Sequence, residues 1–355
     1  MLSHPPRSVA PMQHRHFGRT GVQVSPLCLG AMMFGGWGNP DHEDSVRIIH
    51  RALDAGINFI DSADVYSAGE SERIVGQALT GARRDNVVLA TKCHGPMGED
   101  PNARGNSRRW ITRACEGSLR RLGTDWIDLY QIHRYDPWTD LDETLGALSD
   151  LVRAGKVRYV GSSTFPAHVV VEAQWVAAKR NRERFVCEQP PYSMLVRGIE
   201  ADLLPVCEQY GLAVIPWSPL AGGWLSGKYR KGQELPRSGR ASRLPQRYDA
   251  ALPENQRKLE AADQLAELAE DAGISLIELA IAFVIQHPAI TSAIIGPRTM
   301  EQLEGQLGAA DVVLDAKVLD RIDQIVPPGT NLNRADAGWE PPALASPWRR
   351  RRGSR

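Results

Sequence analysis

The chain has 355 residues, of which 42% are hydrophobic and 24% are charged, and its formal net charge at pH 7 is zero. This is the composition of an ordinary globular protein, and the balanced charge excludes a general electrostatic attraction to nucleic acid. The most apolar long run, residues 276–285, is too short to cross a bilayer, so we expect no membrane partner.

The five cysteines are scattered, without a CxxC motif or a pattern of paired cysteines and histidines. Such usage is typical of reduced thiols in a cytoplasmic protein and does not favour a disulfide frame or a zinc site. The cysteines are Cys28, Cys93, Cys115, Cys187 and Cys207.

Both ends of the chain differ in composition from the middle. Residues 1–13 carry no apolar signal segment, and we expect a disordered leader there. Residues 327–355 are rich in proline and end in a run of arginines at 349–352, so we expect a disordered tail. Residues 14–326 show no linker and are predicted to form a single domain.

The elements of this domain begin with a Gly-Arg-Thr-Gly turn at 18–21 between two short extended pieces, which predicts a β-hairpin. Short apolar runs and amphipathic helices then alternate through eight rounds, which is typical of a parallel barrel. The predicted strands are 27–32, 58–61, 87–91, 126–132, 157–163, 185–189, 212–217 and 292–296. The predicted helices are 41–55, 71–79, 107–122, 141–154, 167–180, 199–210, 254–271, 275–286, 300–308 and 316–326.

The alternation predicts an α/β fold, a (β/α)8 TIM barrel with an N-terminal β-hairpin and extra C-terminal helices. A doubly wound open sheet is the alternative. The stretch 218–253 between the seventh strand and the next helix is rich in glycine and arginine, and loops of this length are usually functional.

Polar residues follow or end three neighbouring strands of the predicted barrel. Asp61 ends the second strand, Lys92 the third and His133 the fourth, and Tyr66 lies five residues beyond Asp61. Buried parallel strands are expected to be continuously apolar, and the carboxyl ends of barrel strands form the active face. These four side chains are therefore expected to meet over one cavity.

The chemistry of this group points to proton donation. A phenol has a pKa near 10, and a neighbouring ammonium group lowers it. A carboxylate beside Lys92 would keep the amine charged, and the imidazole of His133 could orient a carbonyl oxygen. Tyr66 could then protonate an oxygen that gains charge as hydride arrives on its carbon.

In order and approximate spacing, Asp61, Tyr66, Lys92 and His133 resemble the catalytic tetrad of the aldo-keto reductases. The resemblance extends over about residues 14–326 and is nearer to bacterial members, potassium-channel beta subunits and deoxysugar reductases than to vertebrate aldose reductases. It implies the reduction of an aldehyde or ketone by hydride from a nicotinamide, with NADPH as the cofactor and NADH as a second candidate. No side chain of the tetrad can supply the hydride itself.

The later strand ends supply candidate cofactor contacts. Ser163 and Gln189 could bond a carboxamide, Trp217 could stack on the nicotinamide ring, and Arg298 at a helix N-terminus could pair with a phosphate. With the roles that the resemblance implies, the cofactor set is Gly30, Ala31, Met32, Asp61, Ser163, Thr164, Gln189, Trp217, Ser218, Pro219, Leu220, Ala221, Gly222, Lys228, Arg240, Gly296, Arg298, Gln302 and Gln306.

Four positions depart from the family pattern. Thr164 stands where asparagine is common, Gly296 and Pro297 replace a Lys-Ser pair, and Gln306 stands where asparagine is common. The expected preference for NADPH therefore depends on Arg298.

The expected partner is a small carbonyl compound, and a sugar or nucleotide-linked keto-sugar is one candidate class. Trp37, Tyr66, His94 and His133 are the candidate substrate contacts, and Trp110, Trp138 and Trp224 are further candidates for an aromatic wall. The oligomeric state cannot be read from the sequence.

Three other functions compete with carbonyl reduction. One is a cofactor-binding regulatory subunit, but the channel beta subunits typically lack a histidine at the position of His133. A second is the reduction of a sugar enoyl intermediate. A third is a metal-dependent barrel hydrolase, which the dispersal of the nine histidines disfavours, so we expect no metal site.

Overall fold

The computed structural model describes residues 12–234, 236, 241, 244–341, 344 and 349. Eight parallel strands form one curled sheet in the order β10-β3-β4-β5-β6-β7-β8-β9, which confirms the predicted barrel and excludes the open doubly wound alternative. The strands are β3 (Leu27–Gly30), β4 (Phe59–Asp61), β5 (Val88–Cys93), β6 (Ile127–Ile132), β7 (Val157–Ser163), β8 (Cys187–Gln189), β9 (Ala213–Val214) and β10 (Ala293–Ile295).

The ring closes between β9 and β10 through the residues that flank these two short strands. Thr291 N donates to Val214 O at 2.9 Å, Ile294 N donates to Pro216 O at 2.9 Å, and Trp217 and Ile294 form a parallel bridge. The sequence predicted a strand over 212–217, whereas β9 has only two residues. Pro216 has no N–H and cannot extend a regular ladder, which accounts for the short strand.

The predicted N-terminal hairpin consists of β1 (Arg15–His16) and β2 (Gln23–Val24), which pair antiparallel. Its loop carries Phe17, which is buried and meets Phe59 edge-on at 5.7 Å between ring centroids. Phe17 belongs to a buried cluster with Phe59 and the interior side chains Ala90 and Leu129. The hairpin therefore closes the amino-terminal end of the barrel interior.

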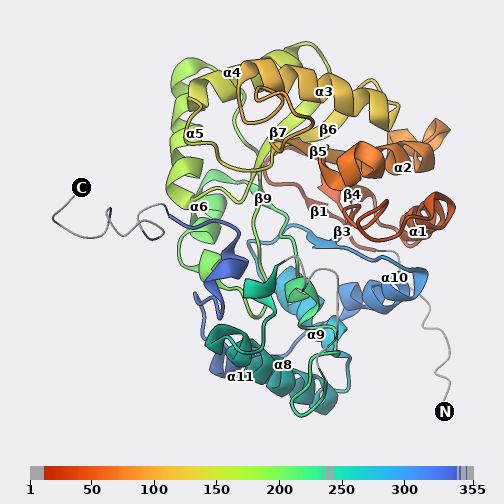
Figure 1. Cartoon of the computed structure of the whole chain (residues 1–355), viewed down its shortest axis with the longest axis vertical. Helices are drawn as coiled ribbons and strands as arrows, with labels where there is room; N and C mark the ends of the chain where they lie inside the picture. Colours follow the sequence, from red (N-terminus) through yellow and green to blue (C-terminus); the bar gives the residue numbers. More distant parts are fainter. Residues whose placement is uncertain are drawn as a thin grey trace.

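Helices surround the strands, with α3, α4 and α5 on one side of the sheet and α8, α9 and α11 on the opposite side (Figure 1). Their ends carry strong sequence signals. Ser275 and Glu278 form a capping box at the start of α9, and Gly123 ends α3 in the left-handed conformation. The helices are α1 (His42–Asp54), α2 (Glu70–Ala78), α3 (Arg108–Leu122), α4 (Leu141–Arg153), α5 (Ala167–Arg180), α6 (Leu203–Tyr210), α8 (Pro253–Asp271), α9 (Leu276–Gln286), α10 (Met300–Leu307) and α11 (Ala316–Ile325).

The predicted helix over 199–210 is divided in the structure. A short 3₁₀ turn, η3 (Gly198–Glu200), precedes α6, whose N-cap is Asp202. The Asp202 side chain accepts from the N–H of Leu203, so the carboxylate starts a new helix inside the predicted one.

Residues 327–341 of the expected tail have defined contacts in the structure. The turn η7 (Arg334–Ala337) contains Asp336, whose buried carboxylate lies 2.7 Å from Lys258 Nζ and 2.5 Å from Arg247 Nε. Asn333 Nδ2 donates to Asn255 Oδ1 at 2.8 Å. The sequence signals for disorder, proline and arginine content, carried no information on these buried pairs. The division of the chain at 13 and 326 stays a prediction.

The described part of the long loop after β9 contains two turns, η4 (Ala221–Gly223) and η5 (Pro245–Arg247). Arg240, one of the candidate cofactor contacts, lies outside the described residues. All five cysteines are free and buried. In the described ranges, no helix is long and apolar enough to cross a membrane.

Candidate active site

The barrel interior is built in layers because side chains on a strand alternate between its two faces. Phe59, Ala90, Leu129 and Cys187 belong to the buried interior cluster that the hairpin closes. Two residues further along the same four strands stand Asp61, Lys92, Gln131 and Gln189. The next interior layer toward the carboxyl end is therefore polar.

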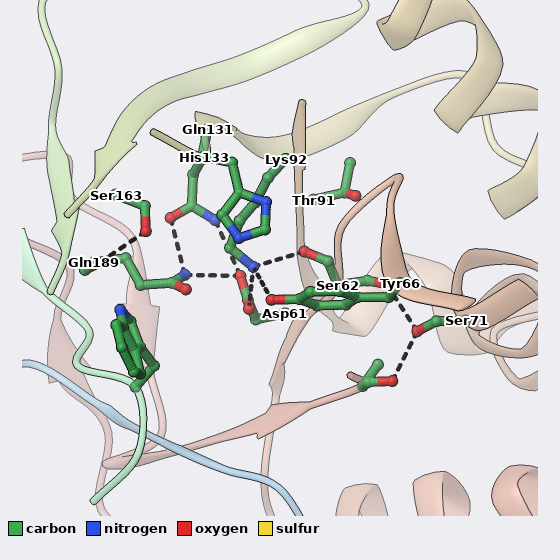
Figure 2. Close-up of polar contacts among 12 residues, drawn as sticks. Asp61, Ser62, Tyr66, Ser71, Thr91, Lys92, Gln131, His133, Ser163 and Gln189 are labelled. Atoms are coloured by element: carbon green, nitrogen blue, oxygen red, sulfur yellow. Dashed lines mark hydrogen bonds and ion pairs between the residues drawn. The ribbon is translucent and has the colours of Figure 1, made fainter. Parts of the chain in front are cut away.

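Lys92 on β5 is the centre of this layer (Figure 2). Its Nζ donates to Asp61 Oδ2 at 2.5 Å, to the Ser62 carbonyl oxygen at 2.8 Å and to Tyr66 Oη at 3.3 Å. Lys92 has 0% exposure and Asp61 has 2%. A buried ammonium of this kind needs a full set of acceptors, and these three oxygens supply it.

Two amide side chains hold the other oxygen of Asp61. Gln131 Nε2 donates to Asp61 Oδ1 at 3.0 Å, and Gln189 Nε2 donates to the same oxygen at 2.9 Å. Gln189 Nε2 also donates to Gln131 Oε1 at 3.1 Å. The carboxylate therefore stays satisfied on both oxygens and fixes the position of Lys92.

Tyr66 opens the short turn η1 (Tyr66–Gly69) after β4, and its hydroxyl faces the Lys92 amine. His133 immediately follows β6, and its ring meets the Tyr66 ring edge-on with centroids 5.8 Å apart. Trp37, which is 43% exposed, lies with its ring centroid 6.0 Å from that of Tyr66. Asp61, Tyr66, Lys92 and His133 thus meet as the sequence predicted, beside an exposed indole.

Two opposing effects act on the pKa of Tyr66. Burial raises the pKa of Tyr66 above its ordinary value, and the opposing effect of Lys92 offsets only part of this shift. Lys92 lowers the pKa of Tyr66 as the sequence predicts, but desolvation disfavours the phenolate more than the ammonium stabilises it.

Lys92 and His133 shift in opposite directions. Burial opposes the charge of Lys92, but Asp61 and Tyr66 together outweigh it and raise the pKa of Lys92. Burial, with Lys92 and Arg134 adding to it, lowers the pKa of His133 well below its ordinary value. The site therefore pairs a charged amine with a neutral imidazole at neutral pH.

The expected carboxamide contacts lie together beside this group. Ser163 Oγ donates to the Gln189 carbonyl oxygen at 2.9 Å, and Trp217 Nε1 donates to Thr164 Oγ1 at 3.3 Å. Thr164 has φ 57°, a left-handed conformation that is costly for a β-branched residue. Strain of this kind clusters at ligand sites, where the surrounding structure holds it.

The start of the long loop continues from Trp217 with further left-handed residues. Ser218 has φ 60°, Ala221 has φ 50° and Gly222 has φ 69°. The N–H groups of Ala221 and Gly223 donate to Ser218 O at 2.8 Å and to Leu220 O at 2.9 Å, so they close the turn. Pro219 is buried, Leu220 is partly buried and Lys228 is exposed.

The expected nucleotide contacts gather at the start of α10. Arg298 and Gly296 are exposed, and Arg298 N donates to Gln302 Oε1 at 2.8 Å. A Cβ at Gly296 would meet no atom within 4 Å, so the approach to this helix end is open. Gln306 is buried and its Oε1 has no hydrogen-bond partner, so an amino group such as that of adenine would satisfy it. These residues fit the nucleotide part of a nicotinamide cofactor.

The first strand contributes mainly through close packing. A Cβ at Gly30 would lie 2.6 Å from Ile294 Cγ2 on β10, so only glycine allows this approach. Ala31 N donates to the main-chain oxygen of Asp61 at 2.8 Å, which places the residues after β3 beside the end of β4. Met32 follows at the partly buried rim.

The remaining candidates for substrate contact lie in different environments. His94 is partly buried and contacts Asn106 Oδ1 through Nδ1 at 2.9 Å. Trp224 is buried in a stack with Tyr229, with centroids 4.3 Å apart, and therefore serves packing. Trp110 is buried in α3, and Trp138 is 94% exposed, so neither shows a contact with the tetrad.

Sequence reasoning missed three contributors to this site. Gln131 could have been found, because a buried polar residue two positions before His133 must share its face of β6. Arg134 gave no signal in the sequence, and its Nη1 donates to Thr164 Oγ1 at 3.1 Å. Gly338 of the expected tail approaches so closely that a Cβ there would lie 2.9 Å from Thr164 Cγ2 and 3.0 Å from Trp217 Cζ2.

The described residues contain no group of three or more histidine, cysteine, aspartate or glutamate side chains that could hold a metal ion. A phenol 3.3 Å from an ammonium group, with an imidazole beside it, can donate a proton, stabilise charge and orient an oxygen.

Comparison with known proteins agrees with this geometry. The family model described as "Aldo/keto reductase family" matches residues 26–327. The chain is 41% identical to the "Uncharacterized oxidoreductase YrpG" of Bacillus subtilis over 327 residues, which cover 89% of this chain and 96% of the relative.

Other relatives carry more specific names. A "Probable voltage-gated potassium channel subunit beta" of Oryza sativa is 36% identical over 321 residues, covering 89% of this chain and 97% of the relative. A "Norsolorinic acid reductase" of Emericella nidulans is 33% identical over 319 residues, covering 86% of this chain and 79% of the relative. The match over most of the chain, together with the barrel and its polar layer, means that the protein belongs to the aldo/keto reductase family and is an oxidoreductase.

Proposed function

We propose that this protein reduces an aldehyde or ketone to an alcohol, with NADPH as the hydride source and Tyr66 as the proton donor. The observation that carries the proposal is the position of Lys92 Nζ, 3.3 Å from Tyr66 Oη and 2.5 Å from Asp61 Oδ2 in a fully buried setting. An ammonium group held in this way can stabilise the phenolate that forms when Tyr66 gives up its proton.

The bound nicotinamide would supply a hydride to the carbonyl carbon. Residues of the chain would orient and protonate the carbonyl oxygen. The neutral imidazole of His133 donates a hydrogen bond that orients it, and Tyr66 transfers its hydroxyl proton to it as negative charge develops. Asp61 keeps Lys92 charged through the cycle. Carbon gains the hydride and oxygen the proton, so the alcohol forms without a free alkoxide.

The names of the relatives suggest where the substrate search should begin. Besides the norsolorinic acid reductase, a relative of Schizosaccharomyces pombe that is 32% identical over 351 residues is named "Putative aryl-alcohol dehydrogenase C977.14c". The exposed indole of Trp37 beside Tyr66 would suit an aromatic carbonyl compound. Aromatic aldehydes and ketones should be screened first, followed by keto-sugars and nucleotide-linked keto-sugars. The buried free cysteines favour a cytoplasmic location for the protein.

A regulatory subunit with little turnover is the second candidate, because of the relatives named as channel beta subunits. Binding of NADPH together with turnover of any carbonyl compound would favour the enzyme. Binding of NADPH without turnover of the whole screen would favour the regulatory subunit. His133, beside Tyr66 in this chain, supports the enzyme.

The rate of reduction should depend little on pH between about 6 and 9. The Tyr66 pKa is raised by burial, so the phenol stays protonated through this range, and the lowered pKa of His133 keeps the imidazole neutral. The measurement is kcat/KM for a non-ionising aldehyde across the range.

Two other buried carboxyl groups could add a transition of their own. Burial raises the pKa of Glu188 to about 7 and the pKa of Asp64 to about 8. Glu188→Gln and Asp64→Asn therefore serve as controls. A midpoint between about 6 and 9 that persists in both variants would mean that Tyr66 or His133 titrates there, against the proposal.

Arg298→Ala should raise the NADPH dissociation constant by roughly one to two powers of ten, because a charge-assisted contact with a phosphate contributes about 1.5–3 kcal/mol. NADH, which lacks the 2′-phosphate, should be less affected. Calorimetric titration of both cofactors gives the comparison, with Arg321→Ala on α11 as a control for the loss of an exposed arginine. Equal losses of affinity for NADPH and NADH would mean that Arg298 does not contact the 2′-phosphate.

A further inference from the structure

Arg134 is a cation at the active face whose charge has no paired carboxylate. It follows His133 at the carboxyl end of β6, and its side chain is partly buried. Its Nη1 donates to His133 O at 2.7 Å and to Thr164 Oγ1 at 3.1 Å, and its guanidinium carbon lies 5.9 Å from the centre of the Trp217 ring. Among the described residues it forms no ion pair within 4.0 Å.

The hydrogen bonds of Ser163 and Gln189 leave each of them with a free acceptor. Both hydrogens of Gln189 Nε2 are used, on Asp61 Oδ1 at 2.9 Å and on Gln131 Oε1 at 3.1 Å. The oxygen Oε1 of Gln189 therefore remains to accept. Ser163 Oγ donates its hydrogen to the Gln189 carbonyl oxygen at 2.9 Å and accepts a long bond from Arg134 Nη1 at 3.5 Å, so one lone pair of Ser163 Oγ remains to accept.

Thr164 presents a hydrogen-bond donor, whereas Ser163 and Gln189 present acceptors. Its Oγ1 accepts from Arg134 Nη1 at 3.1 Å and from Trp217 Nε1 at 3.3 Å. With both lone pairs engaged, the hydroxyl has its hydrogen left to donate. Its contact with Ser163 Oγ is 3.5 Å, at the limit of a hydrogen bond, so that hydrogen is available to a better acceptor.

We propose that Arg134 is a cofactor-positioning residue, which acts through Thr164 to create a hydrogen-bond donor for the oxygen of the nicotinamide carboxamide. Ser163 Oγ and Gln189 Oε1 accept from the carboxamide nitrogen on the other side. In one orientation of the carboxamide, its oxygen and its nitrogen both find hydrogen-bond partners, and in the flipped orientation neither does. The three side chains therefore fix which face of the nicotinamide ring meets the substrate. Arg134 thereby compensates for the absence of an amide side chain at position 164. The inference rests on the proposed function.

Calorimetric titration of Arg134→Met with two ligands tests the inference. NADPH carries the carboxamide, whereas 2′-phospho-ADP-ribose has the same nucleotide without the nicotinamide. The expected result is a loss of NADPH affinity of about tenfold or more, since a hydrogen bond to a charged group is involved, with 2′-phospho-ADP-ribose unchanged within about twofold. Arg180→Met on α5 is the control for loss of a guanidinium elsewhere.

Thr164 variants test the route of the effect. Thr164→Val should lose NADPH affinity by a similar factor, and the double variant with Arg134→Met should lose little more, because the two residues act as one unit. Thr164→Ser, which keeps a hydroxyl, should rescue most of the affinity. These variants also cover the case in which Arg134→Met fails to fold.

Three results would overturn the inference alone, and a fourth would overturn the proposed function as well. Equal losses for NADPH and 2′-phospho-ADP-ribose would give Arg134 a general structural role. Unchanged NADPH affinity, with KM raised for 4-carboxybenzaldehyde but not for benzaldehyde, would assign Arg134 to an anionic group of the substrate. Equal affinity of the wild-type protein for 2′-phospho-ADP-ribose and NADPH would mean that the carboxamide makes no favourable contact. Binding of neither ligand would contradict the proposed function itself.

Discussion

Tyr66→Phe should lower the rate of carbonyl reduction by about 10²–10⁴-fold, the usual contribution of general acid catalysis. The substitution removes the hydroxyl that lies 3.3 Å from Lys92 Nζ and keeps the ring that packs against His133 and Trp37. The affinity for NADPH should hardly change, since the cofactor candidates Ser163, Gln189 and Trp217 keep their own hydrogen bonds. The measurement is single-turnover reduction of an aldehyde, beside a calorimetric titration of NADPH.

Tyr159→Phe on β7 is the matched control, because it removes a phenol hydroxyl from the same sheet outside the tetrad. Turnover of Tyr66→Phe at the wild-type rate would mean that Tyr66 is not the proton donor. That conclusion requires that hydride transfer limits the rate, which a primary isotope effect from deuterated NADPH establishes.

Lys92→Met should damage both turnover and stability. Without the ammonium the phenolate of Tyr66 loses its stabilising neighbour, so reduction should slow by about 10²-fold or more. The substitution also leaves the buried Asp61 carboxylate without its cation, and breaking a buried pair costs about 3–5 kcal/mol. Asp61 keeps its bonds from Gln131 and Gln189, which places the expected loss toward the lower value. Urea unfolding and single-turnover kinetics measure the two effects.

The double variant Lys92→Met/Asp61→Asn separates the two effects. Neutralising the carboxylate removes the unpaired buried charge, so most of the free energy of unfolding should return while activity stays low. A double variant as unstable as Lys92→Met would mean that the lysine stem, and not its charge, stabilises the core. A single variant with full activity would contradict the role given to Lys92.

The barrel and its polar layer could be predicted because both follow from local patterns. Short apolar runs alternate with amphipathic helices, and the period of two along a strand carries Asp61, Lys92 and His133 to the same interior face. The N-cap at Ser107 and the capping box at Ser275 fix helix starts within a residue of the predicted ones.

Other features depend on contacts between segments that are distant in the chain. The short β9 reflects both Pro216 and the approach of β10, and the raised pKa of Tyr66 reflects burial by the whole active face. The contact of Arg134 with Thr164 and the buried pairing of Asp336 with Lys258 join residues 30 and 78 positions apart. No local pattern specifies such pairs, because each depends on how the closed barrel brings its loops together.

Isotopic labelling of the transferred hydride separates carbonyl reduction from cofactor binding without turnover. NADPH with deuterium in both hydrogen positions at C4 of the nicotinamide is incubated with the purified protein and an aromatic aldehyde, and the product is examined by mass spectrometry and NMR. Carbonyl reduction predicts an alcohol with one deuterium on the carbinol carbon and one oxidised cofactor for each alcohol formed. NADPH that binds and stays reduced, while every aldehyde and ketone in the screen is recovered unchanged, would contradict it.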